Sequence, residues 1–429
     1  MDENFIVPFS KKFPFYQKEQ FKNDQISQAY RAWPIFWLAF IRLFYVSLFE
    51  RALSNYLLFD VKINKSTLGI ITSAGALAYI FAPILGQFIT SKIGIRNALI
   101  FTSIITPILT GAQVVYLEPW FLIICRISLG LSLGLFWPNC MNKLSKWQKM
   151  SNPEKANKNF RNFNFSWNFG FILGLLTGYI WAFFLRDYFI MIISWFLSFL
   201  LILISFAIKK DPKIHKPDGK LEIHLENPVL EEYFIRLSRT NSKAPMIVYP
   251  IIFSWIGIIF LTLSKSIFLF TYPIFLTINS LPSQSTYLVQ GGIQVAQLIG
   301  LTWINIMKVQ KRKIAVIIGL IGIIVISYSI FIVGYIWYIA LTFAIAGLFF
   351  GLIHGTSMKI MLDYGTAQNT SKYSTINEIL IGFGFGVTPI IAGYVVEINI
   401  YTLFVFLTIA GIGLLIVIIF LSRNVQNLK

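Results

Sequence analysis

Charged side chains interrupt the long apolar stretches of this chain at few positions, and these side chains are the ones that could do chemistry. Arg42 and Glu50 lie in the first stretch, Arg126 lies in a later one, and Glu378 begins another. A charge in an apolar environment is costly unless it meets water or a partner, so embedded charges mark candidate functional sites. Arginine binds carboxylate or phosphate through its planar guanidinium, and a buried acid can exchange a proton. We therefore expect Arg42 and Arg126 to contact a substrate, and Glu50 and Glu378 to couple its binding to protons.

Three glutamines form a stripe of amide side chains. Gln290, Gln294 and Gln297 follow the i, i+4, i+7 spacing that places side chains on one face of a helix. Lipid cannot satisfy amide groups, so this face must point into a helical bundle. The glutamines either form hydrogen bonds between helices or line a cavity. Because three long amides exceed what packing usually requires, we favour the cavity and predict substrate contacts.

Smaller polar and aromatic groups complete the candidate site. Asn168, with Asn164 one turn before it, forms a second polar stripe. Trp137 and Asn139 flank a proline, at which a helix can kink, and they add an aromatic surface. His354 is a proton-coupling candidate because imidazole titrates near neutral pH. The alternative for His354 is a hydrogen-bonded packing residue.

Membrane-spanning helices must position these side chains. The 429 residues are 56% hydrophobic and 13% charged, which excludes an ordinary soluble protein. A bilayer core requires roughly 20 apolar residues per helix. Continuous apolar runs of this length favour helices over a β-barrel, whose strands alternate in short segments. Twelve spans are predicted, at 33–58, 66–90, 97–116, 120–143, 162–184, 188–208, 246–272, 284–306, 314–333, 336–360, 374–396 and 400–421.

The apolar stretches fall into two halves that resemble each other. Residues 126–141 read RISLGLSLGLFWPNCM and residues 343–358 read FAIAGLFFGLIHGTSM, which aligns Gly130 with Gly347. We therefore expect an all-α membrane protein with twelve transmembrane helices in two six-helix bundles related by an internal repeat. The expected segments are an N-terminal tail at 1–32, a first bundle at 33–208, a central loop at 209–245, a second bundle at 246–422 and a C-terminal tail at 423–429.

The net charge of +18 is distributed unevenly between the two sides of the predicted membrane. Most lysines and arginines fall in the N-terminal tail, at 143–161, in the central loop and at 308–313, all on one side. This positive-inside pattern places both termini in the cytoplasm, and we expect a multi-pass protein of the plasma membrane. It argues against nucleic-acid binding. The expected partners are the lipid bilayer and a small-molecule substrate, bound by a monomer.

Catalytic and metal-binding patterns are missing from the sequence. The three histidines, His215, His224 and His354, are scattered and lack the spacing of metal ligands. No glycine-rich nucleotide-binding loop is present. We therefore expect no enzymatic activity, no metal and no cofactor.

Several local motifs resemble those of the major facilitator superfamily. Residues 86–97 read GQFITSKIGIRN. They are similar to that family's Gly-x-Leu-x-Asp-Arg-x-Gly-Arg motif, with Ser91 where the aspartate is expected. The fourth span carries the family's Arg-x-x-x-Gly pattern, and the fifth resembles a glycine signature of antiporters, with Leu175 in place of proline. The residues that match these motifs are Gly86, Lys92, Gly94, Arg96, Gly130, Gly170, Gly174 and Gly178.

The resemblance implies a secondary transporter that works by alternating access. In this family the first and fourth spans border the central cavity, so we expect Glu50 to pair with Arg126. The pair either takes part in transport or only orients two helices. The solute is expected to be small and organic, the arginines would suit an anion, and a proton or solute gradient would drive transport. Alternatives are a multidrug-type efflux antiporter, a lipid scramblase and a transporter-like sensor.

Overall fold

The computed structural model describes residues 32–150, 153–209, 246–248, 251–307, 311–364, 370–421 and 426–428. The predicted tail at 1–32 and the predicted central loop at 209–245 fall outside these residues except for residues 32 and 209, and of the predicted tail at 423–429 only residues 426–428 are described. The described chain is helical apart from two short strands, β1 (Met246–Val248) and β2 (Gln426–Leu428). These strands pair antiparallel, with Met246 opposite Leu428.

The helices follow one another in two sets. The first set is α2 (Trp33–Asn55), continued by the π-helical turn η3 (Tyr56–Asp60), then α3 (Lys65–Ile93), α4 (Ile95–Val115), α5 (Pro119–Met150), α6 (Pro153–Trp181), α7 (Asp187–Ser198) and α8 (Leu200–Phe206). The second set is α10 (Ile251–Ile278), α11 (Gln284–Ile306), α12 (Arg312–Val333), α13 (Ile336–Tyr364), α14 (Thr370–Ile398) and α15 (Thr402–Leu421).

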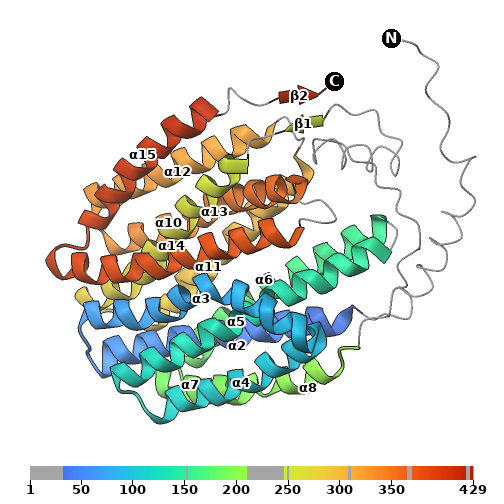
Figure 1. The fold of residues 1–429 in the computed structure, drawn as a ribbon. Helices are drawn as coiled ribbons and strands as arrows, with labels where there is room; N and C mark the ends of the chain where they lie inside the picture. Colours follow the sequence, from blue (N-terminus) through green and yellow to red (C-terminus); the bar gives the residue numbers. More distant parts are fainter. Residues whose placement is uncertain are drawn as a thin grey trace, which may run out of the picture.

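These helices form two bundles that lie side by side (Figure 1). The blue-to-green helices α2–α8 make one bundle and the yellow-to-red helices α10–α15 make the other. The most extensive contacts between the bundles are those of α3 with α14 and of α6 with α11. We call the end at which α2 begins and α15 ends the proximal end, and the opposite end the distal end.

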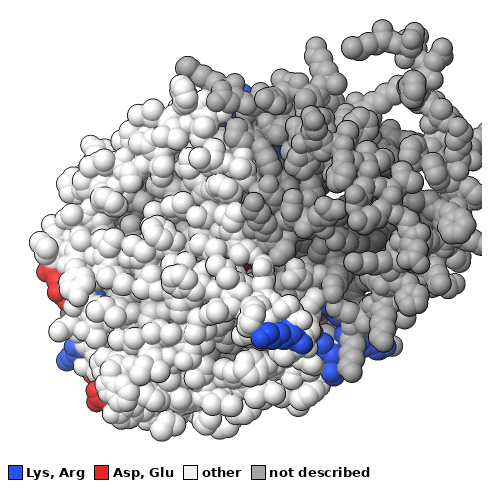
Figure 2. Space-filling view, viewed as in Figure 1, with Lys and Arg blue, Asp and Glu red and all other residues white. Residues whose placement is uncertain are grey.

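Twelve membrane crossings account for the described helices when α7 and α8 are taken as one span. Among the described residues, ten helical segments are long and apolar enough to cross a membrane. The other two crossings are α6 and α11, the helices that carry the asparagine and glutamine stripes, whose amides lower the hydropathy. Figure 2 shows a surface that is almost uncharged between the two ends. The predicted twelve-helix, two-bundle fold is therefore confirmed.

The helix ends differ from the predicted spans because hydropathy marks the membrane and not the helix. α5 continues to Met150 and α6 begins at Pro153, well beyond the predicted spans at 120–143 and 162–184. Polar residues can extend a helix into water, where their side chains stay solvated. The predicted span at 188–208 is interrupted at Phe199. There the Ser198 hydroxyl donates to the Trp195 carbonyl at 2.5 Å, the kind of bond that bends a helix.

Equivalent glycines of the internal repeat make equivalent contacts. A side chain at Gly130 on α5 would meet the backbone carbonyl of Gly75 on α3. Its repeat partner Gly347 on α13 would meet the carbonyl of Ile293 on α11. The shared sequence therefore builds the same close helix pair in both bundles, since only glycine allows two backbones to approach this closely.

Replacing either repeat glycine with alanine should destabilise the protein to a similar degree. In Gly130→Ala and Gly347→Ala the new methyl group must push two helices apart, an overpacking effect of roughly 1–3 kcal/mol. Melting of the purified variants in detergent measures this. Gly413→Ala is the matched control, because a methyl group there meets no atom within 4 Å. Melting of Gly130→Ala at the temperature of the control would contradict the close approach.

Candidate functional site

The interface between α3 and α14 is bridged by hydrogen bonds at three levels. At the distal end the Ser66 amide donates to Glu397 at 3.1 Å. In the middle the Tyr79 hydroxyl donates to Glu378 at 2.5 Å. Toward the proximal end Gln87 donates to Thr375 at 2.7 Å. The predicted proton-coupling residue Glu378 thus sits at a contact between the bundles.

A second set of contacts joins the distal ends of the bundles through Asp187. The buried carboxylate of Asp187 at the start of α7 accepts hydrogen bonds from the Tyr287 hydroxyl at 2.8 Å and the Ser283 hydroxyl at 2.9 Å. Asn55 at the end of α2 donates to the same carboxylate at 3.4 Å. The predicted motif residue Gly178 faces the Tyr287 ring, 2.6 Å from where its side chain would begin. This cluster closes the distal end of the interface between the bundles.

The glutamine stripe of α11 is buried, as its spacing predicts. Gln290, Gln294 and Gln297 are each exposed by 2% or less. Gln294 donates to Asn168 on α6 at 2.8 Å, so the two predicted amide stripes meet across the interface between the bundles. Gln290 donates to the Leu269 carbonyl at 3.3 Å, and its own side-chain oxygen is buried without a hydrogen-bond partner.

Lys265 on α10 organises the stripe, although it is not among the residues predicted from the sequence. Its ammonium donates to the side-chain oxygens of Gln294 at 3.0 Å and Gln297 at 2.5 Å. Gln297 also lies 3.2 Å from Nδ1 of His354 on α13. His354 is therefore hydrogen-bonded inside the second bundle, and its role in proton coupling stays a prediction.

Arg42 is buried in the first bundle and has few polar neighbours. It is 2% exposed, donates to the Thr106 hydroxyl at 2.7 Å, and lies 4.8 Å from the centre of the Phe136 ring. Its Nε is buried without a hydrogen-bond partner. Arg42 is also close enough to Tyr79 to interact with it electrostatically. A cation thus stands near the Tyr79–Glu378 contact.

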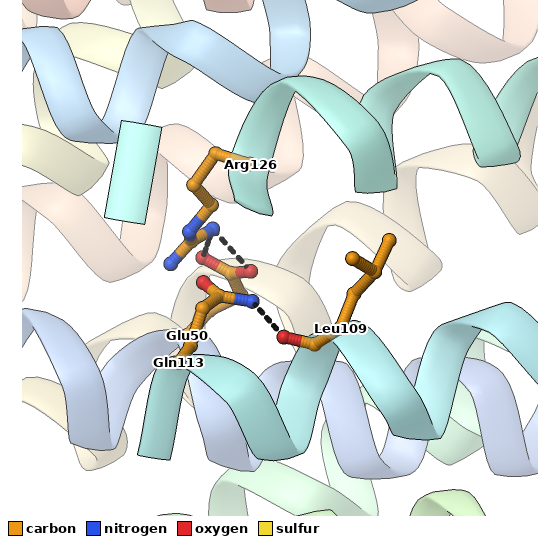
Figure 3. Close-up of polar contacts among 4 residues, drawn as sticks. All are labelled: Glu50, Leu109, Gln113 and Arg126. Carbon is orange, nitrogen blue, oxygen red and sulfur yellow. Dashed lines mark hydrogen bonds and ion pairs between the residues drawn. The ribbon is translucent and has the colours of Figure 1, made fainter. Parts of the chain in front are cut away.

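Glu50 and Arg126 form an ion pair between α2 and α5. Nη1 of Arg126 donates to both carboxylate oxygens of Glu50 at 2.5 Å. Figure 3 shows Gln113 of α4 beside this pair, with its amide donating to the Leu109 carbonyl at 3.1 Å. It is the only ion pair among the described residues. The pairing expected from the family resemblance is present, while the predicted roles of both residues in transport remain untested.

Two predicted substrate contacts are engaged within the first bundle. Asn139 donates to the Thr90 hydroxyl at 2.8 Å and to the Leu135 carbonyl at 2.7 Å. Trp137 packs edge-on against Phe163, with ring centres 6.3 Å apart. Both residues therefore have partners in this structure, and a substrate role for either stays a prediction.

The motif at residues 86–97 spans the end of α3 and the start of α4, and it also contacts the residues after α8. Gly94 has a φ of +82°, which favours glycine, and this lets α3 end and α4 begin without a linker. Arg96 donates to the Ile208 carbonyl at 2.6 Å, so it holds the residues after α8. Lys92 lies over the Phe88 ring, 4.1 Å from its centre.

The remaining motif glycines allow close helix contacts. A side chain at Gly86 would meet the Gly134 carbonyl of α5. Side chains at Gly170 and Gly174 would meet the backbone of α2. These three glycines therefore pack helices within the first bundle, whereas Gly178 packs against the second.

Three residues of the candidate site, Lys265, Asp187 and Tyr79, are not predicted from the sequence. Only Lys265 has a recognisable signal there. Lys265 is the only charged residue in Ile251–Ile278, so the rule applied to Arg42 points to it as well. Asp187 directly precedes the predicted span at 188–208 and resembles a loop residue. Tyr79 is one of 19 tyrosines, and nothing in its local sequence distinguishes it.

Comparisons with known proteins agree on the fold. Residues 35–260 match the family model described as Major Facilitator Superfamily. No curated protein matches the chain. Solved structures with the same fold include a POT family transporter in complex with 5-aminolevulinic acid, with 13% identity and a TM-score of 0.69, covering 92% of this chain and 96% of the other.

Two further structures are similar over most of their length. The nucleoside transporter NupG is 13% identical, with a TM-score of 0.65, covering 91% of this chain and 99% of the other. The human organic anion transporter MFSD10 (TETRAN) is 12% identical, with a TM-score of 0.63, covering 91% and 98%. At these identities the likeness establishes the fold and leaves the substrate open.

Proposed function

Because this chain belongs to the major facilitator superfamily and is a secondary transporter rather than an enzyme, we propose that it moves a small organic solute by alternating access, driven by a proton gradient. The structurally similar proteins are a nucleoside transporter, a POT family transporter in complex with 5-aminolevulinic acid and an organic anion transporter. Nucleosides, 5-aminolevulinic acid and organic anions are small organic solutes, which supports the same size class here.

The observation that carries alternating access is the contrast between contacts within and between the bundles. Within a bundle, helices meet backbone to backbone at glycines such as Gly130 and Gly347. Between the bundles, exchangeable side-chain hydrogen bonds recur, including Asp187 with Tyr287 and Glu378 with Tyr79. Two rigid bodies joined by breakable polar contacts can rock against each other. Opening the distal end would require Asp187 to release Ser283 and Tyr287.

Glu378 is the residue that we propose couples transport to protons. As a carboxylate it accepts the hydrogen bond of Tyr79 from the other bundle. As a neutral acid it would lose the charge that strengthens this bond. Protonation would therefore weaken a contact that joins the bundles, and a proton gradient would bias their relative position. Glu50 is a weaker candidate, because Arg126 already neutralises it.

The basic loops support an orientation with the proximal end in the cytoplasm, and we place the protein in the plasma membrane. Cys125 and Cys140 are buried, so cysteines introduced at exposed positions can be labelled selectively. An impermeant maleimide added to intact cells should label Asn64→Cys, at the distal end, and leave Ser91→Cys, at the proximal end, unlabelled. The reverse pattern would invert the proposed orientation.

Counterflow in proteoliposomes tests the proposed function. Vesicles preloaded with a candidate solute should take up the same radiolabelled solute faster than empty vesicles. Candidates come from a melting screen, since a bound solute stabilises the protein by mass action. Binding without exchange would instead indicate a sensor. Redistribution of fluorescent phospholipid without solute exchange would indicate a scramblase.

A further inference from the structure

Among the residues that the structure describes, the ammonium group of Lys265 has only neutral hydrogen-bond partners. It donates to the amide oxygens of Gln294 and Gln297. The one ion pair among the described residues is formed elsewhere, by Arg126 and Glu50. A cation held between helices is costly without an opposite charge. Two amide oxygens orient the ammonium but leave its charge uncompensated.

The position of Lys265 suits a ligand as the missing anion. Its neighbours Ser264 and Ser266 are buried, and Lys265 as a whole residue is half-buried. Its bonds to α11 place its amino group on the side of the helix that faces the bundle and not the lipid. The charge is therefore uncompensated and is directed toward α11, inside the bundle.

The side chains next to Lys265 carry further hydrogen-bonding groups. The amide of Gln294 reaches Asn168 on the first bundle at 2.8 Å, and the amide of Gln297 lies 3.2 Å from His354. Hydrogen-bond donors thus flank the ammonium on both sides. Because Gln294 touches both Lys265 and Asn168, a change in its contacts at the ammonium is transmitted to the interface between the bundles.

We propose that Lys265 binds the anionic group of the transported solute, a carboxylate or a phosphate. The anion replaces the oxygens of Gln294 and Gln297 as the partner of the ammonium. The released Gln294 then loses its fixed contact with Asn168, which couples solute binding to movement of the bundles. This assignment rests on the proposed transport function and defines the chemical class of its substrate.

Ligands that differ only in their head group test the assignment. Melting of the purified full chain is measured with benzoate, phenyl phosphate and the uncharged benzamide. Benzoate or phenyl phosphate should raise the melting temperature of the wild type, and benzamide should not. Whichever anion stabilises more identifies the preferred group. Lys265→Gln retains a donor for the two glutamines but removes the charge, so it should weaken anion binding roughly 10- to 100-fold, the range for losing a charged hydrogen bond.

A second measurement separates a binding role for Lys265 from a structural one. Without ligand, Lys265→Gln should melt at or above the wild-type temperature, because an uncompensated charge is removed. A clear drop in melting temperature would show that Lys265 stabilises the fold, and would count against a binding role. Lys359→Gln is the matched control, since this lysine of α13 instead donates to the Ile304 carbonyl at 2.8 Å, and it should bind anions like the wild type.

The outcomes distinguish this inference from the proposed function. Counterflow of an anion that is lost in Lys265→Gln and kept in Lys359→Gln supports both. If only neutral or cationic solutes show counterflow, the anion site is overturned but the transport function is supported. Equal anion binding by wild type and Lys265→Gln would also overturn it, as would no response of the wild type to either anion. Failure of every solute to exchange would count against the transport function itself.

Discussion

Glu378→Gln should exchange solute at close to the wild-type rate but fail to accumulate it against a gradient. Glutamine has nearly the shape of glutamic acid and can accept the hydrogen bond of Tyr79, so the bundles can still meet and part. It cannot take up or release a proton, so movement of the bundles no longer depends on the pH difference. We expect accumulation driven by an imposed pH gradient to fall to the equilibrium level, while counterflow stays within about threefold of wild type, an energy change near 0.6 kcal/mol.

Proteoliposomes with and without a pH gradient provide both readouts for this variant. Glu397→Gln is the matched control, because Glu397 lies on the same helix and also bonds across to α3, yet is exposed at the distal end. It should accumulate solute normally. If Glu378→Gln still accumulates solute, another group couples transport to protons. Loss of counterflow as well, in a variant that folds normally, would show that Glu378 is needed for the transport cycle itself.

Breaking the Glu50–Arg126 pair on one side should destabilise the first bundle strongly. In Arg126→Gln the Glu50 carboxylate loses its counter-charge. Removing one partner of a buried pair costs about 3–5 kcal/mol. The side chains of Arg126 and Glu50 are 10% and 27% exposed, so water can reach the carboxylate, and we expect about 2–3 kcal/mol. The melting temperature and the transport rate of Arg126→Gln should therefore both be lower than those of the wild type.

The double variant Glu50→Gln/Arg126→Gln separates stability from transport. Two amides can hydrogen-bond each other without a net charge, so most of the lost stability should return. We expect transport to stay roughly 100-fold below wild type, as for the loss of a charged contact, because Arg126 is a predicted substrate contact. Recovery of transport together with stability would mean that the pair only orients α2 and α5. Arg186→Gln, at an exposed position of the distal end, should change stability by no more than about 0.5 kcal/mol.

Much of the fold follows from local properties of the chain. Twelve apolar runs of sufficient length predict twelve helices, and the repeated glycines predict two similar bundles. The hydropathy of α6 and α11 is below that of a typical span. Even so, both helices can be recognised from the apolar residues on either side of their amide side chains. The exact ends of α5 and α6 are not, because a helix continues into water without any change in backbone hydrogen bonding.

Only part of the candidate site can be predicted from local properties of the sequence. Helical periodicity is sufficient to predict that the face with Gln290, Gln294 and Gln297 is buried, since any lipid-facing position would leave these amides unsatisfied. The identity of their partners depends on the rotation of α10 and α13 around α11. Lys265 became part of the site only when that rotation was known, although its isolated charge in an apolar helix was visible beforehand.

The amino-acid sequence by itself determined the membrane class, the number of crossings, the repeat and the embedded charges, because each of these is visible in short segments of the sequence or in the comparison of two such segments. Tertiary structure alone decided which polar side chains meet between the two bundles. Tyr79 and Glu378 are 299 positions apart, and Asn168 and Gln294 are 126 apart. Contacts between bundles arise from helix rotation and tilt, which are set by the sum of many packing contacts and leave no local pattern. That is why the tyrosine opposite Glu378 and the ammonium among the glutamines emerged only with the folded chain.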